Sequence, residues 1–268
     1  MRVLVTNDDG IFAEGLWALV RGLKKVARVT VVAPIREQSA VGTAVTLHHT
    51  LRIQKVSLTE PEVEAYSVEG TPSDCVILAL EKLIEDKVDL VVSGINHGLN
   101  LGDDVLISGT VSAALQGYLR GFPALAISIA TTDSLQLENA AKLAALLAEK
   151  VVSRELSSNV LLNVNLPDLP LAQIKGVQLT QLASKSHINT VEEGNDGRRQ
   201  YYWLVRQQTD RVADNQTDIW VIEQGNISIT PLHTSLLNRQ APAIPSDLCV
   251  HLLQGLQQRQ VLRRSVDN

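Results

Sequence analysis

Aromatic residues are scarce in this 268-residue chain: Phe, Trp and Tyr together make up 3% of the sequence. The hydrophobic fraction is nevertheless 45%, so a core has to be built mainly from Val, Leu, Ile and Ala. Aliphatic strands of this kind are typical of parallel sheets whose two faces are covered by helices. The shortage of aromatic residues therefore favours an α/β protein with a sizeable core.

An excess of positive charge is also missing, since the formal net charge is −5. This balance argues against binding to a nucleic-acid polymer. The two cysteines, Cys75 and Cys249, are far apart, so they indicate buried reduced thiols rather than a disulfide framework or a zinc cluster. No apolar run approaches the ~18 residues of a membrane span, and no basic-then-apolar leader is present, so we expect a cytoplasmic protein without membrane contact.

Three familiar sequence motifs are absent. The chain has no Gly-Lys-Ser/Thr of a Walker A loop and no G-x-G-x-x-G of a dinucleotide site. It also lacks the G-x-S-x-G elbow of a serine hydrolase. Any phosphate or hydrolytic chemistry must therefore use another arrangement of residues.

Short apolar runs alternate with helical periodicity over the first two thirds of the chain. Strands are predicted at 3–6, 29–33, 88–94, 124–130 and 159–167, and helices at 16–23, 71–85, 110–121 and 135–153. This alternation predicts a Rossmann-like, doubly wound, mostly parallel sheet in a three-layer α/β/α arrangement. Ligands of such folds bind at the carboxyl ends of the strands.

The remaining segments are more polar. Residues 44–56 and 63–68 are predicted to be extended or to form a hairpin, and 197–206 and 226–232 to be strands. A terminal helix is expected at about 245–258. We expect one domain over 1–268, with its core at 1–167 and with β arms and a helix at 168–268 that serve oligomerisation.

The first predicted strand ends in the sequence Asn-Asp-Asp-Gly, which places two carboxylates side by side. Gly10 relaxes the backbone, so Asp8 and Asp9 could converge on one cation. Ser39 follows a second strand at the same predicted edge, and a third strand leads to Asn96, Asn100, Asp103 and Asp104. Such oxygen ligands suit Mg²⁺, Mn²⁺ or Ca²⁺. The alternative is an ordinary helix N-terminal turn, where Asp is also common; the run of two carboxylates favours the metal.

A glycine-rich loop is predicted at 94–109, and Ser108, Gly109 and Thr110 open the helix that follows it. Free backbone N–H groups at such a helix start can hold a phosphate. The same residues are equally consistent with a simple capped helix. His97, within this loop, is interpreted as a solvated side chain.

Several longer motifs together resemble one family. They are TNDDG (6–10), APIREQSAVGTAVT (33–46), GTPSDC (70–75), SGINHGLNLGDDVLISGTVSAAL (93–115), YYW (201–203) and SITPL (228–232). In order and spacing they are similar to the stationary-phase survival protein SurE family. The resemblance extends from residue 1 to about residue 232, and the long loop motif is its most specific part.

The resemblance implies a Rossmann-like fold and a metal-dependent nucleoside monophosphate phosphatase. It assigns one divalent cation, Mg²⁺ or Mn²⁺, to Asp8, Asp9, Ser39 and Asn96, and phosphate binding to Asn96 and the Ser108–Thr110 turn. Expected substrates are nucleoside 5′- and 3′-monophosphates, and short polyphosphate in some members. Homodimers or homotetramers with exchanged or docked C-terminal segments are implied.

This chain departs from the family pattern at two positions. Ile107 and Asn226 stand where family members often have Tyr, and neither position has a ligand role. The predicted reaction is attack of a metal-activated water on the phosphate, with Asp8 or Asp9 as the base. One alternative is a non-catalytic, metal-dependent nucleotide sensor. Another is a covalent phosphoaspartate, which the lack of a lysine in the site loops disfavours.

Overall fold

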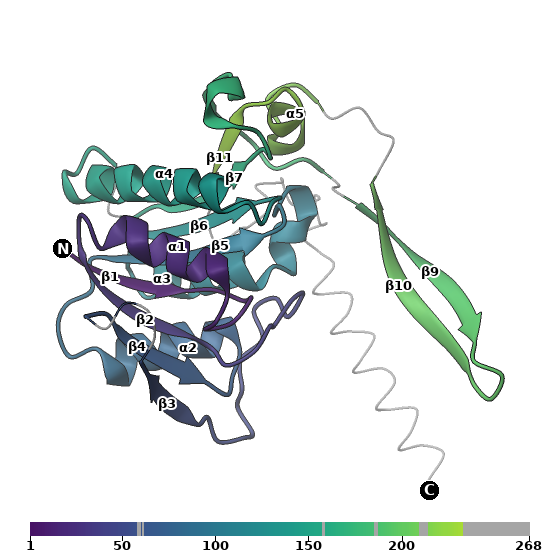
Figure 1. Ribbon diagram of the computed structural model, residues 1–268, viewed down its shortest axis with the longest axis horizontal. Coiled ribbons are helices and arrows are strands. Elements are labelled where there is room, and N and C mark those ends of the chain that lie inside the picture. Colours follow the sequence, from purple (N-terminus) through teal and green to yellow (C-terminus); the bar gives the residue numbers. More distant parts are fainter. Residues whose placement is uncertain (58–59, 61, 157–158, 185–186, 209–213, 233–268) are drawn as a thin grey trace, which may run out of the picture. The chain divides into compact units, whose positions relative to one another are not determined.

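A nine-stranded, mostly parallel sheet forms the centre of the protein (Figure 1). The computed structural model describes residues 1–232 except 58–59, 61, 157–158, 185–186 and 209–213, all within one compact unit, Met1–Leu237. The strand order is β3 (Ile53–Val56), β4 (Glu64–Val68), β2 (Arg28–Pro34), β1 (Arg2–Thr6), β5 (Leu90–His97), β6 (Ala124–Ile129), β7 (Leu161–Leu166), β11 (Ile227–Leu232) and β8 (Val177–Leu179). Strands β4 to β7 are parallel, whereas β3 pairs antiparallel with β4 and β11 pairs antiparallel with β7. The predicted doubly wound fold is confirmed.

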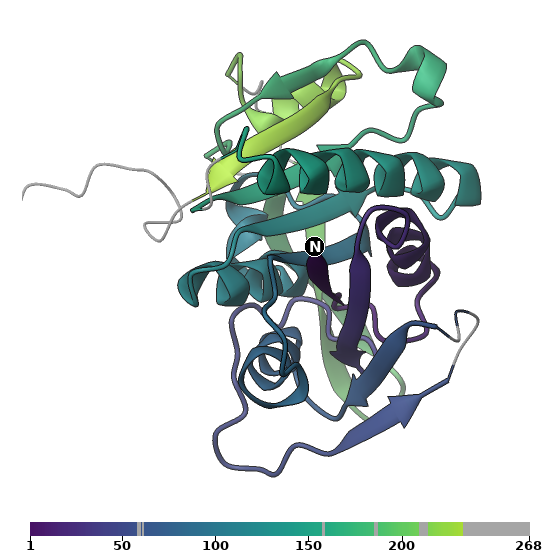
Figure 2. The same cartoon turned by 90° about the vertical axis from the view of Figure 1, so that its left-hand side faces the viewer.

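Helices cover both faces of the sheet (Figures 1 and 2). One face packs on α1 (Glu14–Leu23) and α4 (Ser134–Val152), and the other on α2 (Pro72–Leu78) and α3 (Gly109–Leu119). Successive strand residues point to opposite faces of the sheet. Val3 and Val5 therefore belong to the core between the sheet and helices α1 and α4, and Leu4 to the core between the sheet and helices α2 and α3. Within the described ranges, no helix has both the length and the apolar character needed to cross a membrane.

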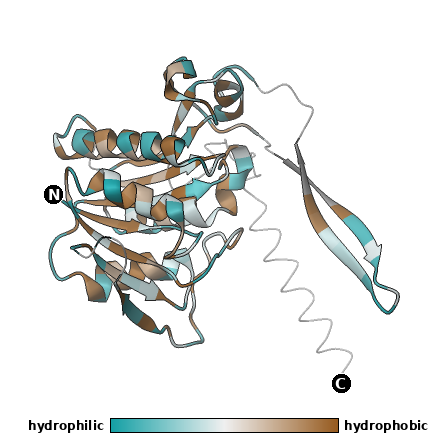
Figure 3. Ribbon diagram, in the orientation of Figure 1, coloured by the Kyte–Doolittle hydropathy of each residue, from teal (hydrophilic) through white to brown (hydrophobic). Residues whose placement is uncertain are grey.

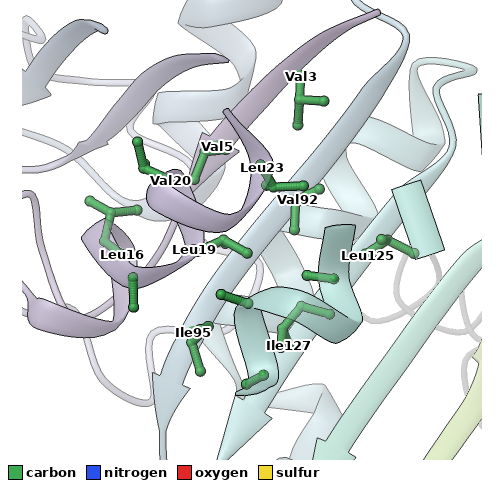
Figure 4. Packing of buried hydrophobic residues seen from close by; sticks show 14 of the residues in the cluster. Val3, Val5, Leu16, Leu19, Val20, Leu23, Val92, Ile95, Leu125 and Ile127 are labelled. Carbon is green, nitrogen blue, oxygen red and sulfur yellow. The ribbon is translucent and has the colours of Figure 1, made fainter. Parts of the chain in front are cut away.

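The two cores are aliphatic, as the composition predicts. Figure 4 shows Leu16, Leu19 and Leu23 of α1 packed against strand residues such as Val92 and Ile127. Figure 3 shows the strands of the central sheet largely in hydrophobic colours, while polar residues are interspersed along α4. Cys75 is fully buried on α2, as expected for a structural thiol, and Cys249 lies outside the described residues.

Helix starts and stops follow local signals in the sequence. Thr71 caps α2 and forms a capping box with Asp74, and Pro72 occupies the first turn. The helix predicted at 71–85 is α2 followed by a π-helical turn, Ala79–Leu83. Gly121, with a φ of +82°, ends the segment after α3, as predicted.

The glycine-rich segment differs from the prediction, because much of it is regular structure. Strand β5 continues through Asn96 to His97, past a register shift between Ser93 and Asn96. Gly94 accommodates this bulge with a φ of +131°, which is why the strand does not end there. A 3₁₀ helix, Gly102–Leu106, fills the centre of the predicted loop. Asn96 is therefore a strand residue.

The C-terminal third contains a β-hairpin and a short helix, in addition to strands β8 and β11 of the main sheet. Strands β9 (His187–Asn195) and β10 (Gln200–Gln208) form a separate antiparallel hairpin, of which the sequence predicted only the second strand. The short helix α5 (Asp218–Glu223) is not evident in the sequence pattern. The terminal helix predicted at 245–258 lies outside the described residues.

Candidate active site

The Asn-Asp-Asp-Gly sequence forms a closed turn at the carboxyl end of β1. The buried side chain of Asn7 donates from Nδ2 to the carbonyl of Gly10 (3.0 Å) and accepts the Gly10 N–H (3.2 Å). Gly10 has a φ of +100°, a conformation that side chains disfavour. The turn therefore fixes the backbone on either side of Asp8 and Asp9.

Three distant segments contact this turn. The Gln38 N–H donates to the Asp8 carbonyl (2.7 Å), and the His97 N–H donates to Asp9 Oδ2 (3.3 Å). From the start of α3, the Thr110 hydroxyl donates to Asp8 Oδ1. The ends of β1, β2 and β5 and the N-terminus of α3 thus meet around the two aspartates, as the sequence predicts for the carboxyl edge of the sheet.

Gly109 allows the close approach of α3 to the turn. A Cβ at this position would lie 2.6 Å from the Cβ of Asp8 and 2.8 Å from its Oδ2, well inside van der Waals contact. Only glycine fits between the helix start and the carboxylate. The Ser-Gly-Thr sequence is thereby tied to Asp8 directly, in addition to its role in beginning a helix.

Both carboxylates are held in surroundings that disfavour their charge. Burial raises the pKa of Asp8 to about 6, and the charge of Asp9 adds to the rise against an opposing hydrogen bond from Thr110. Burial also raises the pKa of Asp9, as does the charge of Glu37, while the His97 N–H lowers it. Within the described residues, no lysine or arginine forms an ion pair with either aspartate.

Ser39 lies at the exposed rim of this cluster. Its hydroxyl donates to the carboxylate of Glu37, whose charge acts on Asp9. The Ser39 oxygen is therefore on the same loop that Gln38 joins to the Asp8 backbone.

Among the described residues, the side-chain nitrogen of Asn96 has a hydrogen-bond partner and its side-chain oxygen has none. Its Nδ2 donates to the carbonyl of Gly98 (2.7 Å), which leaves Oδ1 as an acceptor. Two desolvated carboxylates that lack a cationic partner among the described residues, together with an amide oxygen and a hydroxyl, match the donor set that Mg²⁺ or Mn²⁺ prefers. On this chemistry the residues fit a divalent cation.

The start of α3 has the features of an anion site. Ser108 is its N-cap and accepts the Val111 N–H (3.1 Å), so the hydroxyl keeps its own hydrogen to donate. The Thr110 hydroxyl is instead engaged by Asp8. The Thr110 hydroxyl thus orients a carboxylate, a contact that the sequence did not reveal.

Asn100 does not belong to the cluster, although it follows β5 and carries a similar oxygen. Its N–H donates to Asn165 Oδ1 (2.8 Å) and its Nδ2 to the Ser128 hydroxyl (2.9 Å). Its carbonyl accepts the amide groups of Asn163 (2.8 Å) and Asn165 (3.0 Å). The asparagines within the apolar pattern of β7 are the sequence signal for this buried network.

Asp218 is a further residue that sequence reasoning missed. Its buried carboxylate accepts the N–H groups of Gly102 (2.7 Å), Ala183 (2.9 Å) and Ile219 (2.9 Å). Burial raises the pKa of Asp218, and the three N–H groups oppose the rise. Together with Asn165, it anchors the segment that leads from β5 to the Ser-Gly-Thr turn.

The fold and this cluster define a Rossmann-like α/β protein with an oxygen-rich acidic site beside a helix N-terminus. The model of the family "Survival protein SurE" matches residues 3–189. The chain belongs to the SurE family. The solved structure of the SurE protein from Aquifex aeolicus is similar, with a TM-score of 0.76, 36% identity and coverage of 89% of this chain and 95% of that one.

Curated relatives of this chain carry the name 5′-nucleotidase SurE. The protein from Dehalococcoides mccartyi (strain ATCC BAA-2266 / KCTC 15142 / 195) is 58% identical over 249 residues, which cover 92% of this chain and 94% of the relative. The protein from Moorella thermoacetica is 48% identical over 239 residues, covering 89% and 92%, respectively.

Proposed function

We propose that this protein is a phosphatase that requires a divalent cation and hydrolyses nucleoside 5′- and 3′-monophosphates. The contact between Asp8 and the start of α3 carries the proposal, because it joins a pair of carboxylates to an anion-binding helix N-terminus. The name of the relatives, 5′-nucleotidase SurE, supports the substrate class. Short polyphosphate is a further substrate under this proposal.

Asp8, Asp9, Ser39 and Asn96 would hold the cation, either Mg²⁺ or Mn²⁺. When bound there, it would supply Lewis-acid chemistry, polarising a phosphate oxygen and acidifying a water. The raised pKa values of Asp8 and Asp9 fit this role. Burial disfavours the charged form of each carboxylate, and a bound cation would offset this cost by favouring the charged form.

The protein's own groups would position the phosphate and remove a proton. The Ser108 hydroxyl and the Gly109 N–H lie at the start of α3, where a phosphate would meet the positive end of the helix. Thr110 would keep Asp8 oriented. Asp9, which is less buried than Asp8, would accept the proton of the attacking water.

The test measures phosphate release from nucleoside 5′- and 3′-monophosphates and short polyphosphate. Purified protein is assayed after chelation and after addition of Mg²⁺ or Mn²⁺. Asp9→Asn should lose metal-dependent turnover by at least about 10³-fold, while Asp168→Asn, which removes an exposed carboxylate, should retain it. Undiminished turnover by Asp9→Asn would contradict the proposed site. Tight nucleotide binding without phosphate release would instead identify a sensor.

We also propose that the chain forms a homodimer or homotetramer through its C-terminal third. The hairpin β9–β10 supports this, because Tyr202, Trp203 and Leu204 are 60%, 65% and 83% exposed on it. Large exposed apolar side chains of this kind are typical of interfaces. Light scattering should give a multiple of 29.2 kDa for the protein, and a monomer would contradict the proposal.

A further inference from the structure

A cavity of about 360 Å³ lies at the edge of the sheet opposite the aspartate cluster. Its walls come from the chain just before β1, β5 and β6 and from the end of α4. Asp8 and Asn96 stand at the carboxyl ends of β1 and β5, whereas this cavity meets the amino ends of the same strands. None of the residues around it has a role in the chemistry proposed above.

The floor of the cavity is apolar and held in place by the sheet. Val88 and Val151 are 3% and 7% exposed. Phe122, one of only two phenylalanines in the chain, is partly buried and lines the same cavity. The Pro123 carbonyl accepts the Val91 N–H (3.0 Å), so the segment before β6 is bonded to β5. The cavity therefore has a fixed aromatic and aliphatic surface before any ligand binds.

The rim carries more positive than negative charge, although the protein as a whole has a net charge of −5. Lys87 and Arg154 are exposed there, and within the described ranges neither of them forms an ion pair. Among the described residues around the cavity, Asp89 has the only carboxylate, and this group accepts the N–H of Arg2 (2.9 Å). Two cationic groups beside an apolar floor complement an anion with an apolar body.

Arg154 occupies a backbone position that usually belongs to glycine. It directly follows Ser153, the C-cap of α4, and has a φ of +61°. At the same position after α3 and α5 the chain has Gly121 (φ +82°) and Gly225 (φ +78°). A side chain disfavours this left-handed conformation. A helix C-terminus does attract basic groups, but any residue of the last turn satisfies that preference. Arg154 therefore lowers stability where it stands, as residues at functional sites often do.

We propose that this cavity binds a small aromatic carboxylate, with its ring against Phe122 and its carboxylate between Lys87 and Arg154. The planar guanidinium can donate two parallel N–H groups to a carboxylate, and the lysine adds a second positive charge. Aromatic rings pair favourably with phenylalanine, and the volume suits a body of one or two rings. The site goes beyond the phosphatase proposal, since it uses no residue of the aspartate cluster.

Equilibrium dialysis with 2-naphthoate tests the site. We expect a Kd of about 1 mM for this anion. Acetate, which lacks the ring, and 2-naphthalenemethanol, which lacks the charge, should each bind at least about tenfold more weakly. In the amide NMR spectrum, 2-naphthoate should shift the signals of Val88, Phe122 and Arg154 and leave those of Asp8 and Asp9 in place.

Arg154→Gly separates binding from folding. It should weaken 2-naphthoate binding by about tenfold and also raise Tm, because glycine relieves the left-handed backbone. Gln216→Gly is the matched control, since Gln216 is exposed, has a φ of +73° and lies outside the cavity. This control should raise Tm as well and keep the Kd of the unaltered protein. Lys87→Gln should weaken binding by about threefold, whereas Lys82→Gln, at an exposed position outside the cavity, should not.

A lack of 2-naphthoate binding would overturn the proposal, as would equal binding of the uncharged analogue or amide shifts confined to residues outside the cavity. An unchanged Kd in Arg154→Gly or in Lys87→Gln would overturn it too. A lower Tm of Arg154→Gly beside a raised Tm of Gln216→Gly would assign Arg154 to packing and so contradict its role in ligand binding. None of these readouts depends on phosphate release, so they decide about the cavity whether or not the phosphatase proposal holds.

Discussion

The aspartate cluster makes a quantitative prediction about the stability of the metal-free protein. Burial raises the pKa of Asp8 from 3.8 to about 6. The folded protein therefore holds this proton more tightly than the unfolded chain does. The resulting contribution to stability is fully present below pH 3.8 and is lost as the pH rises to about 6. With about 1.4 kcal/mol for a difference of one in pKa, the loss is about 3 kcal/mol.

Replacing Asp8 by Asn removes this titration and keeps an oxygen that can accept the Thr110 hydroxyl. Without metal at pH 7, the free energy of unfolding of Asp8→Asn should exceed that of the unaltered protein by up to about 3 kcal/mol. The advantage should disappear at pH 4. Added Mg²⁺ or Mn²⁺ should stabilise the unaltered protein at pH 7 and leave Asp8→Asn unchanged.

Urea denaturation in the presence of a chelator, repeated from pH 4 to pH 7.5, measures these free energies. Asp168→Asn, at an exposed position, controls for the loss of one negative charge and should follow the unaltered protein. An equal difference in stability between Asp8→Asn and the unaltered protein at pH 4 and pH 7 would contradict the role given to the Asp8 titration. A lower stability of Asp8→Asn at pH 7 without metal would contradict it as well.

Two further substitutions test how the site is positioned. Gly109→Ala places a methyl group 2.6 Å from the Cβ of Asp8, so α3 must shift and kcat/KM for nucleotides should fall by about 10²-fold, with the circular dichroism spectrum retained. A fully active Gly109→Ala would show that this contact has no part in catalysis. Asp218→Asn leaves one of its N–H partners, such as Gly102, without an acceptor and should lower the free energy of unfolding by about 1–3 kcal/mol. Because Asp218 anchors the segment that leads to the Ser-Gly-Thr turn, the substitution should also raise the inhibition constant of inorganic phosphate and leave the Mg²⁺ concentration for half-maximal activity unchanged. A change in the Mg²⁺ requirement alone would contradict this anchoring role.

Much of the fold could be predicted from local sequence patterns. The alternation of apolar runs and helical periodicity gives the parallel strands and the helices α1, α3 and α4 close to their observed bounds. Thr71 with Pro72 marks the start of α2, because a cap and a first-turn proline act within a few residues. Strand β9 and helix α5 could not be predicted, because the polar sequence around them shows neither the alternation of a strand nor the periodicity of a helix.

Part of the candidate site could likewise be predicted from the sequence. The sequence alone indicated that Asp8, Asp9, Ser39 and Asn96 follow strand ends on one edge of a sheet, because parallel strands place their carboxyl ends together. It also indicated a helix start at Ser108. The SurE family model matches residues 3–189, a range that contains all of these residues. The variants Asp8→Asn and Asp9→Asn test the proposed ligand roles of the two aspartates.

The tertiary structure alone decided which of these oxygens are available and what holds them. It diverts Asn100 into the buried network with Asn165, engages the Thr110 hydroxyl with Asp8, and joins Gly102 to Asp218 across 116 residues. Periodicity, caps and turn residues act over a few positions, so a sequence displays them directly. A hydrogen bond between segments brought together by the crossovers of a sheet depends on the packing of every element between them, and it has no local signature.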